Sequence, residues 1–191
     1  MVYGAVEGVS AKRVCGEEEY TMLDAIRSRR SIRHFEQRPV PDEIVEQLKE
    51  AMLRSPTGRS LHPWRFVFVR DRELLRALGQ TRQRASAFVA EAPLAVVVCG
   101  EPATSDTWVE DCAIAAVTLQ LAAVELGLGS CWTQVRLREH PDGSSAEDYV
   151  RKVLGLAPDV GVLCTIALGY PSESKPERER DSLAWAKIED R

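Results

Sequence analysis

The chain has 191 residues, of which 45% are apolar and 28% are charged, as expected for one globular domain with a substantial hydrophobic core. Its formal net charge of −4 argues against a protein that gathers nucleic acid or anionic membrane through a general positive field. The five cysteines are odd in number and lack C-x-x-C spacing, which argues against a disulfide framework or a thiolate metal site.

Residues 1–19 show no periodicity and end in three glutamates, so we expect a flexible or partner-wrapping extension there. Met1 is not followed by the pattern of a secretory signal. The longest apolar stretch, residues 113–128, contains polar residues and is too short to span a bilayer. We therefore expect a cytoplasmic protein with one domain over residues 20–191.

Two helices are expected in the first third of the chain. Tyr20–Arg30 is the first, and its apolar residues are expected to face inward: Met22, Leu23 and Ile26. The second begins at Pro41-Asp42, a helix start signal, and ends before Ser55-Pro56. Its apolar residues recur at helical spacing: Ile44, Val45, Leu48, Ala51 and Met52.

The remaining elements alternate irregularly. Residues 94–99 (LAVVVC) are a continuous apolar run, which predicts a strand buried on both faces. Residues 106–126 predict a long central helix, ended by Gly127-Leu128-Gly129. Further strands are expected at 64–70, 130–135 and 160–168, and further helices at 71–78, from there to about 90, and at 146–154. This order fits an α+β domain in which helices cover a mixed β-sheet.

A short cluster, Arg29-Arg30-Ser31-Ile32-Arg33, concentrates positive charge around a hydroxyl group. If the backbone is extended, Arg29, Ser31 and Arg33 project to one side, where two guanidinium groups can bind a single anion. The β-branched Ile32 favours this conformation. On spacing alone, a helix end that carries solvated arginines is an equal alternative.

A second segment, Ser55–Trp64 (SPTGRSLHPW), is rich in turn-forming and hydrogen-bonding residues and leads directly into an apolar strand. Its prolines and glycine constrain the backbone, while Thr57, Ser60 and His62 supply donors and acceptors. Trp64 can cover an aromatic ligand or fill the core. Taken alone, this segment is also compatible with an ordinary turn.

Together these segments resemble the FMN-dependent nitroreductase family, which has Arg-x-Ser-x-Arg and, one helix later, a Pro-Ser/Thr-x-x-Asn-x-Gln-Pro-Trp loop. The resemblance continues at residues 125–132 (ELGLGSCW), at Gly169-Tyr170-Pro171 and at residues 178–181 (RERD). It covers nearly the whole chain, from about Met22 to Arg180. These motifs together, in the family's order, are far more specific than any one of them.

The resemblance implies an intertwined homodimer with a long central helix and with FMN bound tightly but non-covalently at the subunit interface. Arg29, Ser31 and Arg33, with Arg30 nearby, would hold the FMN phosphate and ribityl chain. Arg178 or Arg180 would reach the same phosphate.

For the flavin ring, the resemblance implies that Pro56, Thr57, Gly58, Ser60 and His62 approach from the other subunit. The strand at Thr133, Gln134 and Val135 would pass the reactive edge of the ring and offer a backbone N–H to N5. The family commonly has Asn and Gln where this chain has Ser60 and His62. We expect FMN binding to survive this difference, while substrate choice and flavin potential change.

The implied activity is a ping-pong transfer of reducing equivalents from NAD(P)H, a transient donor, to a nitro compound, a quinone or a similar small acceptor. The flavin would carry the chemistry, without a catalytic side chain. A non-catalytic or regulatory flavin-binding dimer is an alternative, as is a diverged flavin-consuming or reductive dehalogenation activity. The histidines lack ligand spacing, so no metal site is expected, and the negative charge argues against a nucleic-acid binder.

Overall fold

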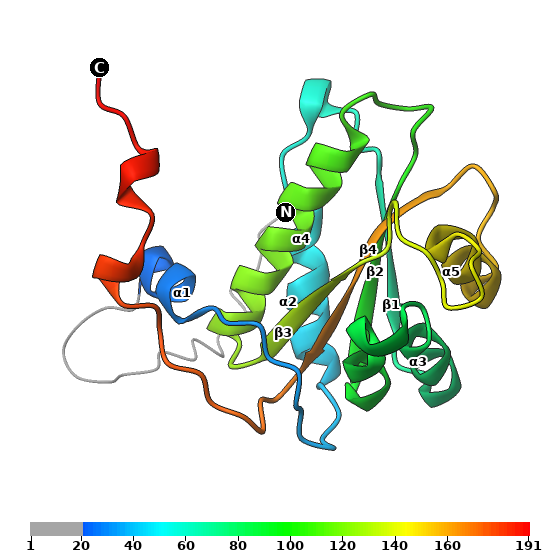
Figure 1. Ribbon diagram of the computed structural model, residues 1–191, viewed down its shortest axis with the longest axis horizontal. Helices are drawn as coiled ribbons and strands as arrows, with labels where there is room; N and C mark the ends of the chain where they lie inside the picture. The colour runs from blue at the N-terminus through cyan, green and yellow to red at the C-terminus, as the bar shows by residue number, and fades with distance from the viewer. Residues whose placement is uncertain (1–20) are drawn as a thin grey trace, which may run out of the picture.

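A central sheet lies between two sets of helices in the computed structural model, which describes residues 21–191 (Figure 1). The strands of this part of the chain are β1 (Trp64–Val69), β2 (Leu94–Gly100), β3 (Gly129–Gln134) and β4 (Gly161–Gly169). Their order is β1-β2-β4-β3, and each neighbouring pair is antiparallel. Ser31 adds a parallel bridge to Ser130 on the edge strand β3, so the sheet has a parallel component there.

The helices divide between the two faces of the sheet (Figure 1). On one face lie α2 (Asp42–Leu53) and the long α4 (Trp108–Glu125), with α1 (Met22–Ser28) packed against α4. On the other face lie α3 (Arg72–Gly79) and α5 (Ala146–Leu154). Short 3₁₀ helices occupy 58–60, 83–85, 87–91, 180–182 and 185–187. The prediction of a long central helix is confirmed by α4, whose buried side chains form much of one hydrophobic layer.

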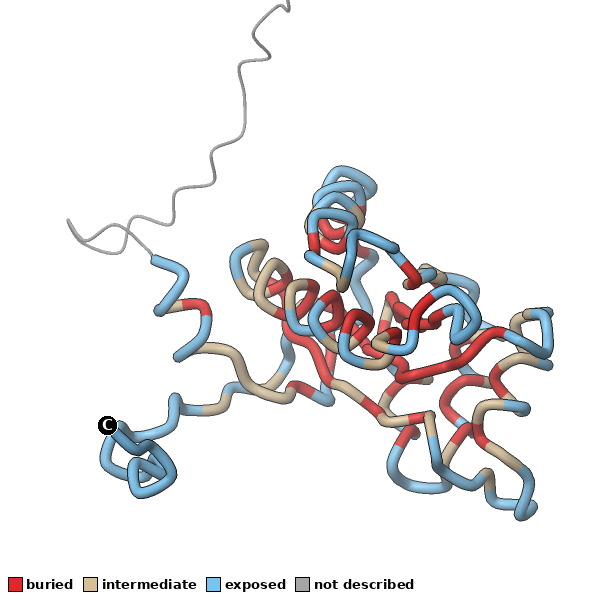
Figure 2. Tube along the Cα trace, turned by 90° about the horizontal axis from the view of Figure 1, so that it is seen from above, coloured by how far each residue is buried: buried red, intermediate tan, exposed pale blue. Residues whose placement is uncertain are grey.

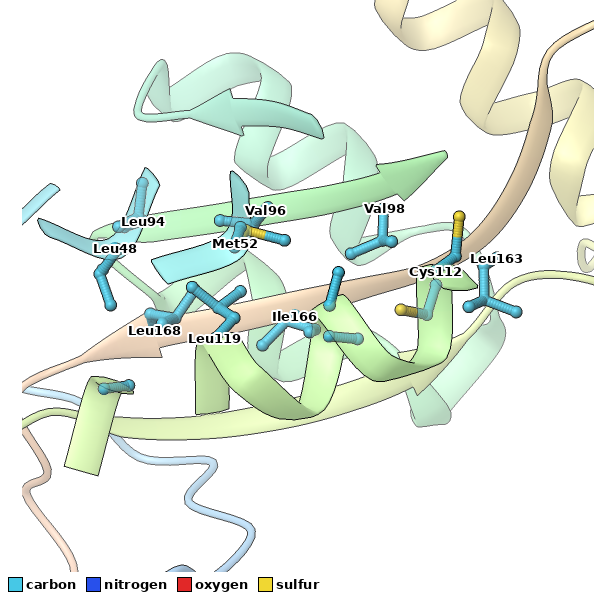
Figure 3. Close-up of a cluster of buried hydrophobic side chains, with 14 of the residues drawn as sticks. Leu48, Met52, Leu94, Val96, Val98, Cys112, Leu119, Leu163, Ile166 and Leu168 are labelled. Atoms are coloured by element: carbon cyan, nitrogen blue, oxygen red, sulfur yellow. The ribbon is translucent and has the colours of Figure 1, made fainter. Parts of the chain in front are cut away.

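Each strand of the inner pair contributes side chains to both hydrophobic layers, because successive residues of a strand point to opposite faces. On β2, Val96 and Val98 pack with α2 and α4, whereas Val97 and Cys99 pack with α3 and α5. Figure 3 shows the first layer, in which Leu119 of α4 lies among strand residues. The prediction that the 94–99 strand is buried on both faces is therefore confirmed.

The expected helix to about residue 90 is wrong, since two short 3₁₀ helices occupy that region. A side chain explains the interruption. The buried Ser86 hydroxyl donates to Gly79 O at 2.8 Å and accepts from Arg82 N at 2.8 Å. Such bonds give the backbone an alternative to the regular helical ladder.

The inward orientation expected for the first helix is also wrong. Within α1 only Ala25 is buried, while Met22, Leu23 and Ile26 are each more than half exposed. Figure 2 shows buried residues concentrated in the sheet and the helices packed on it, whereas most of the segment that follows the grey trace has the colour of exposed residues. The helix ends at Ser28, earlier than expected, and Tyr20 lies outside the described residues, as does the predicted extension at 1–19. The apolar side of α1 therefore has no cover within the described part of this chain.

Of the helices described between residues 21 and 191, none is long and apolar enough to cross a membrane.

Candidate functional site

The segment from Arg29 to Arg33 is extended and runs along the edge strand β3. Arg29 has φ −61° and ψ 120°, which ends α1. Ile32 N–H then donates to Ser130 O at 2.9 Å, beside the bridge between Ser31 and Ser130. Ile32 is buried and Arg33 is exposed, as the alternation of an extended chain requires. The extended conformation is confirmed, and the alternative of a helix end is not.

Close packing fixes the distance between this segment and β3. A Cβ atom added at Gly129 would lie 2.8 Å from the Cβ of Ile32 and 2.9 Å from both of its γ carbons. Real Cβ atoms essentially never approach so closely. Only glycine therefore allows Ile32 to seat against the start of β3, and this contact sets the position of Ser31 and Arg33.

Replacing Gly129 by alanine is expected to destabilise the fold by about 1–3 kcal/mol, the usual cost of overpacking, because the buried, β-branched Ile32 has little freedom to move. Urea unfolding of the G129A variant measures this loss. The Ile32→Ala variant serves as a control background, because it removes the side chain that the added methyl group would meet. Adding Gly129→Ala to it should cost less stability than adding Gly129→Ala to the wild type. An unfolding midpoint equal to that of the wild type in G129A would contradict the packing argument.

Two residues after β4 hold the other side of the segment. The Glu173 carboxylate accepts from Arg33 N at 2.5 Å and from His34 N at 3.2 Å. Lys175 Nζ donates to Ser31 O at 2.5 Å and lies 3.2 Å from Glu173 Oε1. The hydrogen bond from the Arg33 backbone is the main cause that lowers the pKa of Glu173 below its ordinary value, so this carboxylate is ionised at neutral pH.

Cys131 of β3 lies beneath the same polar groups. Burial raises the pKa of its thiol, while the charges of Arg33 and Lys175 and a hydrogen bond with Ser31 act in the opposite direction. Arg33, Lys175 and Ser31 therefore lie near this thiol at the edge of the sheet, together with the Glu173 carboxylate that pairs with Lys175. Two cations and a hydroxyl beside a single carboxylate make this edge of the sheet a candidate site for an anion.

The outer edge of β3 provides backbone groups along the same line. Ser130 O accepts from Ile32, and Gln134 O accepts from Arg82 Nη1 at 3.4 Å. Since main-chain groups alternate along a strand, those of Trp132 also point away from β4. Val135 N–H instead donates to Leu163 O at 3.1 Å, and Thr133 Oγ1 donates to Ala85 O at 3.2 Å. Among residues 133–135, Gln134 is the one whose main chain faces outward.

The loop before β1 has a strained backbone. Arg59, Ser60 and His62 have positive φ angles of 54°, 54° and 49°, a region that non-glycine residues seldom occupy. Gly58 N–H donates to Asp111 Oδ1 of α4 at 2.9 Å, and His62 N–H donates to Thr57 Oγ1 at 3.1 Å.

Buried polar atoms without a partner flank this loop. The hydroxyl oxygen of Ser55 and the indole nitrogen of Trp64 are both buried without a hydrogen-bond partner in the described structure. Trp64 packs against His62, with ring centroids 5.2 Å apart, and stacks on Phe66 at 5.1 Å. Trp64 is therefore part of the core wall and also carries an unused donor.

The two segments lie at opposite ends of α4. The loop contacts Asp111 in the first turn, whereas α1 packs near the last turn, where burial and the negative charge of Asp24 raise the pKa of Glu125. At 1.5 Å per residue, Asp111 and Glu125 are about 21 Å apart along the helix. One chain therefore does not bring the anion site and the loop together.

The C-terminal basic residues divide into two groups. Lys175, which was not predicted from the sequence, contacts the Arg29–Arg33 segment. Arg178 and Arg180 are exposed on the arm that follows, and the Arg180 guanidinium lies 4.6 Å from the centre of the Trp185 ring. This arm extends away from the sheet (Figure 1). Asp111 and Glu173 were also missed, because no local spacing marks a contact between residues so far apart in the chain.

Comparisons with known proteins agree with this fold. The family model described as the nitroreductase family matches residues 26–83 and 78–170. A protein of Methanothermobacter thermautotrophicus, provisionally named NADH dehydrogenase/NAD(P)H nitroreductase, is 35% identical over 162 residues, covering 83% of this chain and 81% of that protein. The structure of an FMN-dependent nitroreductase from Clostridium difficile R20291 is 37% identical with a TM-score of 0.86, covering 88% of this chain and 98% of that chain.

More distant relatives have other names. A 5,6-dimethylbenzimidazole synthase of Rhodospirillum rubrum is 28% identical over 85% of this chain and 88% of its own length. An iodotyrosine deiodinase of Thermotoga neapolitana is 24% identical over 85% of this chain and 95% of its own length. Sequences similar to this chain therefore include proteins named for several different reactions.

Proposed function

The chain belongs to the nitroreductase family, and we propose that it is an FMN-dependent oxidoreductase that passes reducing equivalents from NAD(P)H to a nitro compound, a quinone or a similar small acceptor. The observation that carries this proposal is the anion site of Ser31, Arg33 and Lys175 at the outer edge of β3. An anion site at one end of the edge strand β3, with outward-facing backbone groups further along the strand, suits a long cofactor that carries a phosphate group.

The residues present fit FMN. Arg29, Ser31 and Arg33 would hold the phosphate, with Arg30 nearby and Lys175 as an additional cation. The main chain of Gln134, between Thr133 and Val135, would offer an N–H at the redox-active edge of the ring. When bound, FMN supplies the two-electron chemistry that links the oxidation of NAD(P)H to the reduction of the acceptor in separate half-reactions. No protein side chain need act as acid, base or nucleophile.

We further propose that the active form is a homodimer. The apolar side of α1 is exposed, and so are Ile114 and Val117 of the adjacent α4. Burying them against a second copy would remove this surface from water. The partner would also supply the loop with Pro56, Thr57, Gly58, Ser60 and His62, which one chain holds about 21 Å along α4 from its own anion site. Arg178 and Arg180 of the exposed arm would reach the phosphate in the same assembly.

A diverged reaction on the same fold is the second candidate. It is favoured by the relatives named as a 5,6-dimethylbenzimidazole synthase and an iodotyrosine deiodinase, and by Ser60 and His62, which replace the common amide residues of the loop. Such a protein would bind FMN equally but would differ in the acceptor or in the fate of the flavin.

Anaerobic spectroscopy tests the proposal. We expect purified protein to be yellow, to lose its flavin absorbance on addition of NADH or NADPH, and to recover it when a nitroaromatic or a quinone is added. Yellow protein that neither nicotinamide can bleach would support the non-catalytic dimer instead. A colourless preparation whose unfolding midpoint is unchanged by added FMN would overturn every flavin-dependent function.

A further inference from the structure

The loop from Thr57 to His62 has a strained backbone, although the side chains at its strained positions are not buried. Arg59, Ser60 and His62 have positive φ angles, and each costs roughly 1–3 kcal/mol relative to a relaxed backbone. All three side chains are exposed. These side chains therefore gain too little burial to offset the strain, and another part of the protein must hold the loop in place.

Asp111 is the residue that holds it. This side chain lies in the first turn of α4, and only 3% of the residue is exposed. Its Oδ1 accepts from Gly58 N–H at 2.9 Å, and its Oδ2 accepts from the Thr107 hydroxyl at 3.3 Å. A buried carboxylate is costly unless it is paired by hydrogen bonds, and the amino-terminal end of a helix also stabilises negative charge. Asp111 is thus an anchor that uses both its oxygens.

The loop is seated closely on this anchor. A Cβ atom at Gly58 would lie 2.9 Å from Thr107 Oγ1 and 3.9 Å from Asp111 Oδ1. At the far end of the loop, Thr57 Oγ1 accepts from His62 N–H and lies 3.5 Å from Nδ1 of the His62 ring. The fixed position of Gly58 is therefore passed through Thr57 to both the backbone and the ring of His62.

We infer that Asp111 is a positioning residue that holds Thr57–His62 in this strained conformation, so that the exposed Ser60 and His62 contact bound FMN in the dimer. The inference rests on the proposed function for the identity of the ligand. Asp111 acts through the loop and touches neither cofactor nor substrate. This positioning role explains why the loop keeps a strained backbone although its exposed side chains add little to the core.

The decisive readout is the midpoint potential of bound FMN, obtained by anaerobic titration with dithionite, because it does not require turnover with NAD(P)H. Loss of oriented donors at the flavin ring should disfavour its reduced form. We expect Asp111→Ala to lower the potential by about 30 mV or more, which corresponds to a tenfold loss of preference for the reduced flavin. Asp111→Asn should recover most of this shift, because its amide oxygen can still accept from Gly58 N–H.

Two controls make the test specific. Asp106→Asn removes a charge from an exposed ion pair with Arg59 of the same loop, and it should leave the potential unchanged. In a Ser60→Ala/His62→Ala background, adding Asp111→Ala should give no further shift, since Asp111 acts through these residues.

A wild-type potential in flavin-bound Asp111→Ala would overturn the inference, and so would an equal shift in Asp106→Asn or a full additional shift in the Ser60→Ala/His62→Ala background. Failure of the proposed function is a separate outcome. A colourless wild-type protein that does not bind added FMN would contradict the function before any variant is compared.

Discussion

Replacing Arg29 and Arg33 together by alanine is expected to release FMN from a protein that still folds. A hydrogen bond to a charged group contributes about 1.5–3 kcal/mol, so loss of two such contacts weakens binding by roughly 10²- to 10⁴-fold. The segment itself should stay in place, since it is held by backbone bonds from Ile32 to Ser130 and from Arg33 to Glu173. Flavin absorbance per chain after gel filtration, with a fluorescence titration of added FMN, measures the effect.

A matched control removes the same charge elsewhere. Arg27→Ala/Arg54→Ala deletes two exposed arginines that form surface ion pairs with Asp24 and Glu50. Such pairs contribute little to stability, so this variant should retain its flavin. Stoichiometric flavin in the Arg29→Ala/Arg33→Ala variant would refute the assignment of this segment to the phosphate. Equal flavin loss in the control would show that net charge alone governs binding.

Placing lysines at Ile114 and Val117 is expected to convert the protein to a monomer and to release its flavin. These residues are 43% and 48% exposed and lie three positions apart on one side of α4, the helix against which α1 packs. Two charges at the centre of an apolar interface would have to be desolvated without partners. Sedimentation equilibrium reports the mass, and flavin should be lost because the loop with Ser60 and His62 no longer reaches the site.

Leu137→Lys is the control for this variant. Leu137 is 72% exposed, more than either α4 residue, but it lies by α5, where its N–H donates to Glu147 Oε1 at 3.3 Å. A lysine there should leave both mass and flavin content unchanged. A dimeric Ile114→Lys/Val117→Lys variant would place the subunit interface elsewhere, and a wild type that sediments as a monomer would contradict the proposed dimer.

The elements that can be predicted from the sequence are those with strong local patterns. The continuous run at 94–99 and the long apolar stretch at 106–126 match β2 and α4, because burial on all sides requires apolar residues throughout. Gly127, with φ 75°, ends the long helix as predicted. The extended conformation of Arg29–Arg33 was one of two equal alternatives from the sequence, and the structure decided it through the bridge between Ser31 and Ser130.

The spacing of apolar residues within one helix shows that the helix has an apolar side, but it does not show which part of the protein covers that side. Met22, Leu23 and Ile26 do form an apolar side of α1, but the described part of the chain leaves it exposed. The prediction of a regular helix at 83–91 is wrong for another reason. The hydroxyl of Ser86 forms hydrogen bonds with the backbone that compete with the regular helical bonds. Propensity alone does not reveal this competition.

By itself, then, the sequence determined most of the helices and strands and located the two polar segments, because helix and strand periodicity and turn chemistry act between near neighbours. The tertiary structure decided which groups serve those segments. Asp111 anchors Gly58 from 53 residues away, and Glu173 binds the Arg33 backbone from 140 residues away. No spacing along the chain encodes such contacts. They exist because packing α4 on the sheet, and the segment after β4 beside β3, brings distant polar groups within hydrogen-bonding distance.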